Sequence, residues 1–364
     1  MLVWGHTVKF SSIYTAPHPG FRLRKPRGPT DRNLFCAAKE ADGARCIKKE
    51  KNMNDSFMWS TLVHIGSNLW NEEGNTKGFE GNPRGVASST LRFDKKLWHE
   101  YTEYLKEKGA NTLIVDVCEA MRYDSHPELA VNGSLTKDEM RTEVERLKKM
   151  GFEVVPKLNF SSAHDIWMKD YSYMLATPKY REVCSDLIGE VCEVFCPKYF
   201  HLGMDEEDYK KQKNYDYIVI RQNDVWWKDF YHLVDCTEKN GARPWIWSDL
   251  VWTDPDNFIK KMPKDVLQSN WWYYLELDEQ VSDKAKLRVG AYSLLDKHGY
   301  DQIPAGSNWA YKENFPLLVE YCKNNISSEH LCGFMQTHWM LTTEEYKDTI
   351  FNAADMLEEG KKKF

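Results

Sequence analysis

The sequence predicts a single (β/α)8 TIM barrel of the α/β class, preceded by an irregular N-terminal arm. Eight strand-like segments alternate with helix-like segments over about 300 residues, which is typical of a parallel sheet wrapped by helices. The clearest strands are almost wholly apolar, as expected for strands covered on both faces. Patterns such as Gly-x-Gly-x-x-Gly and the phosphate loop are missing, which argues against a nucleotide-binding sheet. We therefore expect an arm over residues 1–56 and a barrel over residues 57–364.

Composition narrows the class of ligand. A chain of 364 residues can bury a substantial core, and its net charge of −6 provides no general basic field for nucleic acid. Its apolar runs are too short for a membrane span, and its start lacks the long apolar segment of a secretory signal, so the compartment stays open. The nine cysteines include no Cys-x-x-Cys pair, which disfavours a zinc site. We predict no metal and no cofactor, and a ligand that is neutral or small.

The arm is expected to be irregular. Residues 1–56 contain several prolines and clusters of basic residues without a sustained helical or strand period. The sequence assigns no function to this segment.

The first half of the barrel has clear element boundaries. The first strand is predicted over 61–66, and the loop over 67–89 is long enough to shape a site. Asp94 is a plausible N-cap for the first helix, and Gly109 is its stop signal.

Two further units follow in the same manner. The second and third strands are predicted over 112–117 and 153–158. The helix between them begins at Thr136, with Glu139 in capping-box spacing. The next helix begins at Thr177-Pro178, and its expected buried face consists of Tyr180, Val183, Cys184, Leu187, Ile188, Val191 and Cys192.

The second half is predicted from shorter patterns. A fourth strand starts at Tyr199, and four more are expected over 244–248, 266–271, 300–305 and 333–338. The last helix is expected to begin after Thr342, with Glu345 in capping-box spacing.

An acidic pair follows the fourth strand. The aromatic run there ends in Gly203, and Asp205 and Glu206 come directly after Met204. A parallel barrel delivers such side chains to its mouth, where the strands end. The alternative is that these acids only begin a solvated, charged loop.

Other strand ends carry polar and aromatic residues that suit a carbohydrate. Polar groups bind hydroxyls, and flat indoles stack on the apolar face of a sugar ring. The candidates at these ends are Glu119, Arg122, Asn159, His164, Trp247, Asp249, Trp271, Trp272, Asn308, Trp309, Tyr311, His338 and Trp339.

The segment around the acidic pair resembles a known family. Residues 201–206, His-Leu-Gly-Met-Asp-Glu, are similar to the His-x-Gly-Gly-Asp-Glu signature of the family 20 glycoside hydrolases, the β-N-acetylhexosaminidases. Methionine replaces the second glycine. Arg122, followed by Pro127 and Leu129, resembles that family's Trp-Arg segment with Pro-x-Leu, whose arginine binds sugar hydroxyls.

Later segments agree in order over roughly residues 58–350. Residues 156–164 resemble the family's Pro-Glu-x-Asp-x-Pro-Gly-His segment, although Lys157 and Asn159 replace the acids, the Pro-Gly is lost and one residue is added. Residues 247–249 resemble its Trp-x-Glu or Trp-x-Asp. Trp271 or Trp272 resembles the family's sixth-strand tryptophan. Trp339 resembles the tryptophan of its eighth-strand Trp-Thr-Glu, although Met340 and Leu341 follow it here.

The resemblance implies retaining, substrate-assisted hydrolysis of a terminal β-linked N-acetylhexosamine. Glu206 would be the general acid and base, and Asp205 would orient the 2-acetamido group of the sugar. The implied substrate-binding residues are Arg122, His164, Trp247, Asp249, Trp271, Trp272, Asn308, Trp309 and Trp339. We expect Glu206 to have a raised pKa, because partial burial and the charge of Asp205 both favour its protonated form.

Alternatives remain for the mechanism and for single residues. Asp249 or Glu276 is a possible second protein carboxylate, and a carbohydrate-binding barrel without catalysis is a possible different class. Arg122 could instead pair with a nearby surface acid, His164 could cap a loop, and Asp249 could cap a helix.

Overall fold

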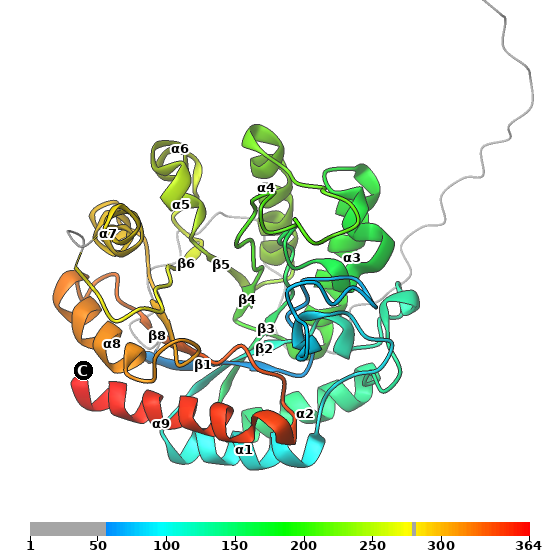
Figure 1. Ribbon diagram of the computed structural model, residues 1–364, viewed down its shortest axis with the longest axis horizontal. Helices are drawn as coiled ribbons and strands as arrows, with labels where there is room; N and C mark the ends of the chain where they lie inside the picture. Colours follow the sequence, from blue (N-terminus) through cyan, green and yellow to red (C-terminus); the bar gives the residue numbers. More distant parts are fainter. Residues whose placement is uncertain (1–55, 279–281) are drawn as a thin grey trace, which may run out of the picture. The chain divides into compact units, whose positions relative to one another are not determined.

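Eight parallel strands form the centre of the molecule. The structure is a computed structural model that describes residues 56–278 and 282–364, so almost all of the arm predicted for residues 1–56 lies outside the described residues. The strands are hydrogen-bonded in the order β6-β5-β4-β3-β2-β1-β8-β7. Parallel bridges from Gln268 to Gln302 and from Trp271 to Ala305 join the two ends of this order. The sheet therefore forms a nearly closed (β/α)8 barrel, as predicted (Figure 1).

The strands contain between three and seven residues each. Their bounds are β1 (Met58–His64), β2 (Thr112–Asp116), β3 (Glu153–Lys157), β4 (Tyr199–His201), β5 (Arg243–Trp247), β6 (Leu267–Ser269), β7 (Ala305–Ser307) and β8 (Gly333–Thr337).

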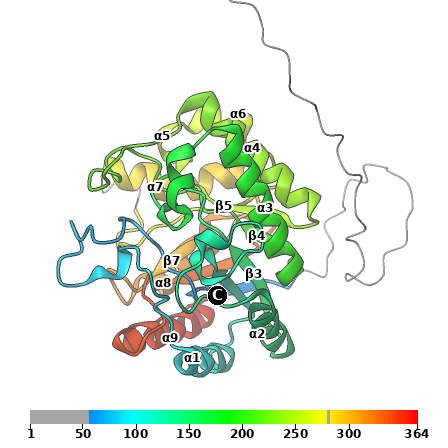
Figure 2. The ribbon, with the colours of Figure 1, turned by 90° about the vertical axis from the view of Figure 1, so that its right-hand side faces the viewer.

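Helices surround the sheet, and the last of them lies beside the first in both views (Figures 1 and 2). The α-helices are α1 (Lys95–Glu107), α2 (Lys137–Lys149), α3 (Pro178–Phe195), α4 (Asn223–Lys239), α5 (Leu250–Thr253), α6 (Pro255–Lys261), α7 (Asp283–Lys297), α8 (Asn314–Asn325) and α9 (Lys347–Lys363). Short 3-10 segments are η1 (Pro83–Gly85), η2 (Cys118–Ala120), η3 (Pro127–Leu129), η4 (Ile166–Met174) and η5 (Glu344–Tyr346). Within the described ranges, no helix combines the length and apolarity needed to cross a membrane.

The helix starts predicted from capping residues are confirmed in the first half. The Asp94 carboxylate accepts the backbone N–H groups of Lys96 and Leu97 at the start of α1. Thr136 and Glu139 form a complete capping box at the start of α2. These side chains satisfy N–H groups that have no partner inside the helix. The expected buried face of α3 is also confirmed, with both of its cysteines in the core.

Several boundaries differ from the predictions. β1 covers Met58–His64 instead of 61–66, and β6 covers Leu267–Ser269 instead of 266–271. The seventh strand lies at Ala305–Ser307 instead of 300–305, because only isolated bridges form at Gln302. The capping box predicted at Thr342 is wrong, since its hydroxyl donates to the carbonyl of His64 in β1. The last α-helix therefore begins later, at Lys347, after η5.

The barrel interior changes from apolar to polar toward the carboxyl ends of the strands. Side chains two residues apart point to the same face of a strand, so Ile114 and Val155 in the apolar layer are followed by Asp116 and Lys157. The Lys157 Nζ and an Asp116 carboxylate oxygen are 2.7 Å apart and fully buried. The polar end of the barrel is therefore the end that can bind a ligand.

Candidate active site

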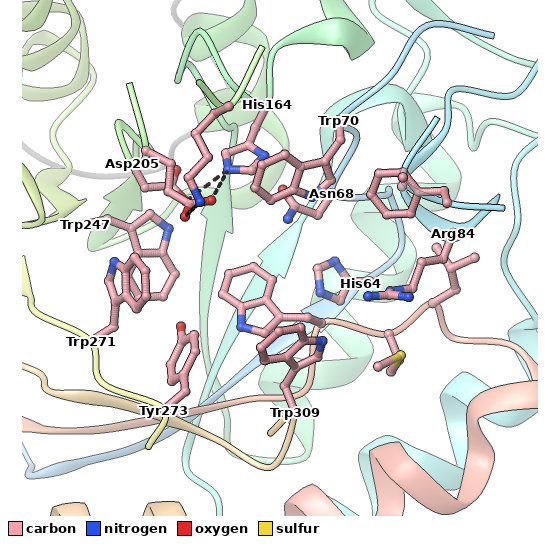
Figure 3. A pocket seen from close by; sticks show the side chains of 18 of the residues that line it. His64, Asn68, Trp70, Arg84, His164, Asp205, Trp247, Trp271, Tyr273 and Trp309 are labelled. Atoms are coloured by element: carbon pink, nitrogen blue, oxygen red, sulfur yellow. Dashed lines mark hydrogen bonds and ion pairs between the residues drawn. The ribbon is translucent and has the colours of Figure 1, made fainter. Parts of the chain in front are cut away.

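A pocket of about 480 Å³ opens at the carboxyl ends of the strands, a volume within the range of small-molecule sites. Figure 3 shows Trp247, Trp271 and Tyr273 on one side of it and Trp70 and Arg84 on the other. The full lining consists of His64, Asn68, Trp70, Gly78, Phe79, Arg84, Gly85, His164, Asp205, Glu206, Lys211, Trp247, Trp271, Tyr273, Tyr274, Lys284, Arg288, Trp309, Trp339, Met340 and Leu341.

The chain turns sharply after β4, and this turn presents the acidic pair. Gly203, Met204 and Glu206 have φ values of 72°, 72° and 56°, a region that side chains other than glycine rarely adopt. A Cβ on Gly203 would lie 2.0 Å from Asn159 Oδ1. Only glycine therefore fits at position 203, and the turn directs Asp205 and Glu206 into the pocket.

Asp205 is buried among groups that favour its charged form. Asn159 Nδ2 donates to Asp205 Oδ1 at 3.2 Å, and His164 Nε2 lies 3.3 Å from Oδ2. Burial alone would raise the pKa of this carboxyl, but His164, Lys157 and Asn159 lower it to about 2. Asp205 is therefore an anion at neutral pH, as its expected role requires.

Glu206 lines the pocket as expected, but its pKa is shifted in the opposite direction from the prediction. Its carboxylate lies 2.5 Å from Lys211 Nζ and 3.4 Å from His164 Nε2. Burial and the charge of Asp205 raise the pKa of Glu206, but these two cations outweigh them, so its pKa lies below the ordinary value. The prediction of a raised pKa is wrong in this structure because the sequence did not reveal which cations face the carboxylate.

His164 joins the two carboxylates, which confirms that it lies in the pocket. Burial would lower its pKa, but Asp205 and Glu206 raise it to about 9. In the described residues, ligand atoms of His164, Asp205 and Glu206 lie within 4.8 Å of one another, close enough to hold a metal ion. In this structure His164 Nε2 lies 3.3 Å from Asp205 Oδ2 and 3.4 Å from Glu206 Oε2, and Lys211 contacts Glu206. The cluster is better described as an ion-pair network.

Asp249 lies behind Glu206 and does not line the pocket. Its Oδ2 accepts the backbone N–H of Glu206 at 2.7 Å, and its Oδ1 is buried without a partner in the described residues. Burial and the charge of Asp205 raise the pKa of Asp249 to about 7. It therefore holds the acidic turn in place from outside the pocket lining.

Glu276, the other carboxylate considered as a second catalytic group, is exposed and outside the pocket lining. Of the carboxylates in the described ranges, only Asp205 and Glu206 line the pocket. The geometry therefore gives no support to a second protein carboxylate on the opposite face of a bound sugar.

Aromatic side chains form much of the pocket wall. Trp247, Trp271, Trp309 and Trp339 all line it, as expected from their positions at strand ends. The rings of Trp247 and Trp339 are 5.8 Å apart, and Trp271 stacks on Tyr273 at 5.1 Å. Trp339 also has a left-handed backbone, with φ 57°, a strain that often marks functional sites.

Besides Asp249, three predicted substrate-binding residues lie outside the pocket lining. Arg122 is exposed and lies outside the pocket lining, two residues after the buried segment η2. Trp272 is buried and donates its indole N–H to the carbonyl of Glu276. Asn308 donates to the Thr349 carbonyl and to Asn352 Oδ1, both in α9. Successive side chains along an extended chain point to opposite faces, so Trp271 lines the pocket while its neighbour Trp272 is buried on the other face.

Several lining residues were missed by the sequence reasoning. Trp70, Phe79 and Arg84 come from the loop over 67–89, which was expected to shape a site without its residues being singled out. Trp70 and Tyr273 were detectable by the same strand-end rule that found Trp271. Lys284 and Arg288 are on α7, and no pattern in the sequence pointed to them.

Comparison with solved structures defines the fold. The chain resembles the Streptomyces plicatus N-acetyl-β-hexosaminidase with a TM-score of 0.56 and 14% identity, covering 84% of this chain and 64% of that one. It resembles the Flavobacterium johnsoniae chitobiase with a TM-score of 0.55 and 17% identity, over 81% of this chain and 48% of that one. The barrel is similar in fold to family 20 glycoside hydrolases.

A shorter structure matches along nearly its whole length. Dispersin B has a TM-score of 0.52 and 14% identity, with 84% of this chain and 98% of that one covered. By contrast, the chain spans about half to two thirds of the first two proteins. No family model matches this sequence, and neither does any curated protein sequence. At such identities the likeness concerns the fold, and the function has to be argued from the pocket.

Proposed function

We propose that this protein is a retaining exo-glycoside hydrolase that removes a terminal β-linked N-acetylhexosamine by substrate-assisted catalysis. The observation that carries the proposal is the pocket's charge arrangement, in which Asp205 and Glu206 are the only lining carboxylates among the described residues. A mechanism with two opposed protein carboxylates needs a second acid across the sugar. A nucleophile within the substrate removes that need.

In the proposed reaction, Glu206 donates its proton to the glycosidic oxygen as the bond to the anomeric carbon breaks. The carbonyl oxygen of the 2-acetamido group forms a new bond to that carbon, and the anionic Asp205 accepts the amide N–H and stabilises the positive charge of the resulting ring. Water then attacks the anomeric carbon from the side that the alcohol left, and the bond between that carbon and the acetamido oxygen breaks, which restores the acetamido group. Glu206 takes the proton of this water, which restores the acid and retains the configuration.

The pocket walls supply the remaining interactions. Trp247 and Trp339 form an indole corner next to the acidic pair, and such faces stack on a pyranose ring. The hydroxyl of Tyr273 is buried, and burial raises its pKa above the ordinary value, so it remains a donor at neutral pH. Tyr273 lines the pocket and stacks on Trp271, so it offers a hydroxyl donor for a polar group of the sugar.

One observation favours a second candidate function, a carbohydrate-binding barrel without catalysis. The contact between Lys211 and Glu206 stabilises the carboxylate form, whereas a general acid has to carry a proton. Catalysis therefore requires that a bound substrate separates Lys211 from Glu206, and a binding protein has no such requirement.

An assay with chromogenic substrates separates these functions. The purified protein is tested on 4-nitrophenyl β-glycosides of N-acetylglucosamine, N-acetylgalactosamine and glucose, with an N-acetylglucosamine-derived thiazoline as inhibitor. Hydrolysis of the acetamido sugars alone, inhibited by the thiazoline, supports the proposal. Binding without turnover across the glycosides supports the second candidate. Turnover of the glucoside that the thiazoline does not inhibit would contradict an acetamido nucleophile.

A further inference from the structure

The pocket is rich in positive charge although the chain as a whole is acidic. Its lining includes Arg84, Lys211, Lys284 and Arg288 against two carboxylates, whereas the chain has a net charge of −6. His164 adds a further positive charge at neutral pH, because its pKa is raised to about 9. A neutral amino sugar does not require this excess of cations.

Two of these cations lie one turn apart on α7. Lys284 Nζ is 4.7 Å from the ring centre of Tyr274, and the Arg288 guanidinium is 4.1 Å from Trp252 and 5.1 Å from Trp271. Residues four apart share one helix face, so both head groups are directed to the same wall of the pocket. In the described part of the chain, neither side chain has a carboxylate partner.

Arg84 supplies a third cation from a different element. It lies in η1 within the loop over 67–89, and its guanidinium is 5.8 Å from the ring of Phe79. Its side chain also makes no ion pair with the carboxylates in the described ranges. Lys211 differs from these three residues because it pairs with Glu206.

Arg288 has no carboxylate partner in the described ranges, which raises the free energy of the folded protein. The side chain is half-buried, and moving a cation out of water without a partner is unfavourable. Burial indeed lowers its pKa, even though the charges of Asp249 and Glu206 raise it. Stacking on Trp252 and Trp271 fixes the guanidinium but leaves its N–H donors available in the plane of the group.

We propose that the pocket recognises an anionic glycan, in which a sulfate ester or a carboxylate near the hydrolysed amino sugar binds Arg288 and Lys284. This inference rests on the proposed function, because it specifies the substrate of the same pocket. Planar guanidinium groups bind oxyanions through paired N–H donors, and a neighbouring ammonium adds charge. Arg84, which lies in the loop over 67–89, adds a third positive charge to the pocket lining.

Equilibrium binding tests this inference without relying on turnover. Titration calorimetry compares N-acetylglucosamine 6-sulfate with N-acetylglucosamine, which places the anion on the bound sugar. A second pair, titrated into the Glu206→Gln variant so that the disaccharides are not hydrolysed, compares N-acetylglucosaminyl-β-1,4-glucuronic acid with its glucose analogue, which places the anion on the leaving side. One charge-assisted contact is expected to favour the anionic member of a pair by at least about tenfold. Added salt should weaken that preference.

Variants locate the preference. Lys284→Gln/Arg288→Gln is expected to bring the ratio of anionic to neutral affinity close to one, and Arg84→Gln alone is expected to lower it less. Lys286→Gln is the matched control, since Lys286 is exposed on the same helix and lies outside the pocket lining. It should keep the wild-type ratio. Circular dichroism of each variant verifies folding, and Arg84→Gln keeps the test decisive if the double variant does not fold.

The outcomes separate this inference from the proposed function. A preference for either anionic ligand that disappears in the double variant supports the inference, and the pair that shows it identifies the position of the anion. Equal affinity within both pairs overturns the inference even if the 4-nitrophenyl substrates are hydrolysed. An anionic preference without any hydrolysis supports the inference but overturns the hydrolase.

Discussion

At the scale of single residues, two adjacent carboxylates differ in role because their surroundings differ. Asp205 accepts from Asn159 and is paired with His164, so it stays charged. Glu206 shares His164 but also contacts Lys211, whose side chain is partly exposed. The contacts of Asp205 are buried, whereas the contact of Glu206 with Lys211 is open to solvent and can change when a ligand enters.

Glu206→Gln is expected to reduce kcat for an N-acetylhexosaminide by about 100- to 10,000-fold, because an amide cannot deliver the proton. Steady-state kinetics on the 4-nitrophenyl substrate measure this loss. Asp208→Asn is the control, since Asp208 is exposed and outside the pocket lining. Similar losses in both variants would show that the charge of the loop matters, and not the acid itself.

Lys211→Met is expected to raise the pKa of Glu206, because the ammonium group now lowers it. A general acid is active when protonated, so kcat/KM is high below its pKa and falls as pH rises through it. The alkaline limb of the pH profile should therefore move to higher pH in this variant. Lys210→Met, an exposed neighbouring change, should leave the limb in place. A shift to lower pH would contradict the contact seen here.

At the scale of elements, the turn after β4 is the part of the fold that creates the site. Gly203 allows the left-handed turn, Asn159 from the chain after β3 packs against it, and Asp249 from the chain after β5 accepts the N–H of Glu206. Three consecutive strand ends thus hold one acidic turn. The strain at Met204 and Glu206 is balanced by these contacts.

Gly203→Ala is expected to destabilise the protein by more than the roughly 1–2 kcal/mol of a left-handed alanine, because its Cβ would also displace Asn159. Losing the Asn159 contact should misplace Asp205 and lower kcat. Gly241→Ala is the matched control, with φ 82° and open space around its Cβ. Urea unfolding and kinetics compare the two variants. Equal destabilisation would show that the contact with Asn159 is unimportant.

At the scale of the whole molecule, the barrel combines an apolar core with a polar upper layer. The pair of Lys157 and Asp116 occupies that layer, and the charge of Lys157 contributes to the low pKa of Asp205. A buried cation below the pocket thus connects the stability of the barrel to the charge of its site.

Lys157→Met is expected to lower the free energy of unfolding by about 3–5 kcal/mol, because it leaves the Asp116 charge buried without its partner. Adding Asp116→Asn should recover part of this loss, which a double-mutant cycle measures as coupling. Urea denaturation followed by tryptophan fluorescence provides the values. Additive effects in the double variant would refute a direct pair.

Local patterns predicted much of the fold and part of the site. The caps at Asp94 and Thr136 were correct because each is decided within one helical turn. The cap at Thr342 failed because β1 competes for its hydroxyl from 278 residues away. Arg122 was misplaced for a related reason, since its motif does not specify the direction in which the chain leaves β2.

The sequence by itself determined that eight strands alternate with helices and that an acidic pair follows the fourth strand at a glycine. It could do so because period, propensity and glycine conformations act over a few residues. Only the tertiary structure decided that Lys211 faces Glu206, that Asp249 lies behind it, and that Arg84 and Arg288 share one pocket. Barrel closure brings such residues together from distant parts of the chain. The pKa of an acid such as Glu206 depends on which charged groups these contacts place beside it.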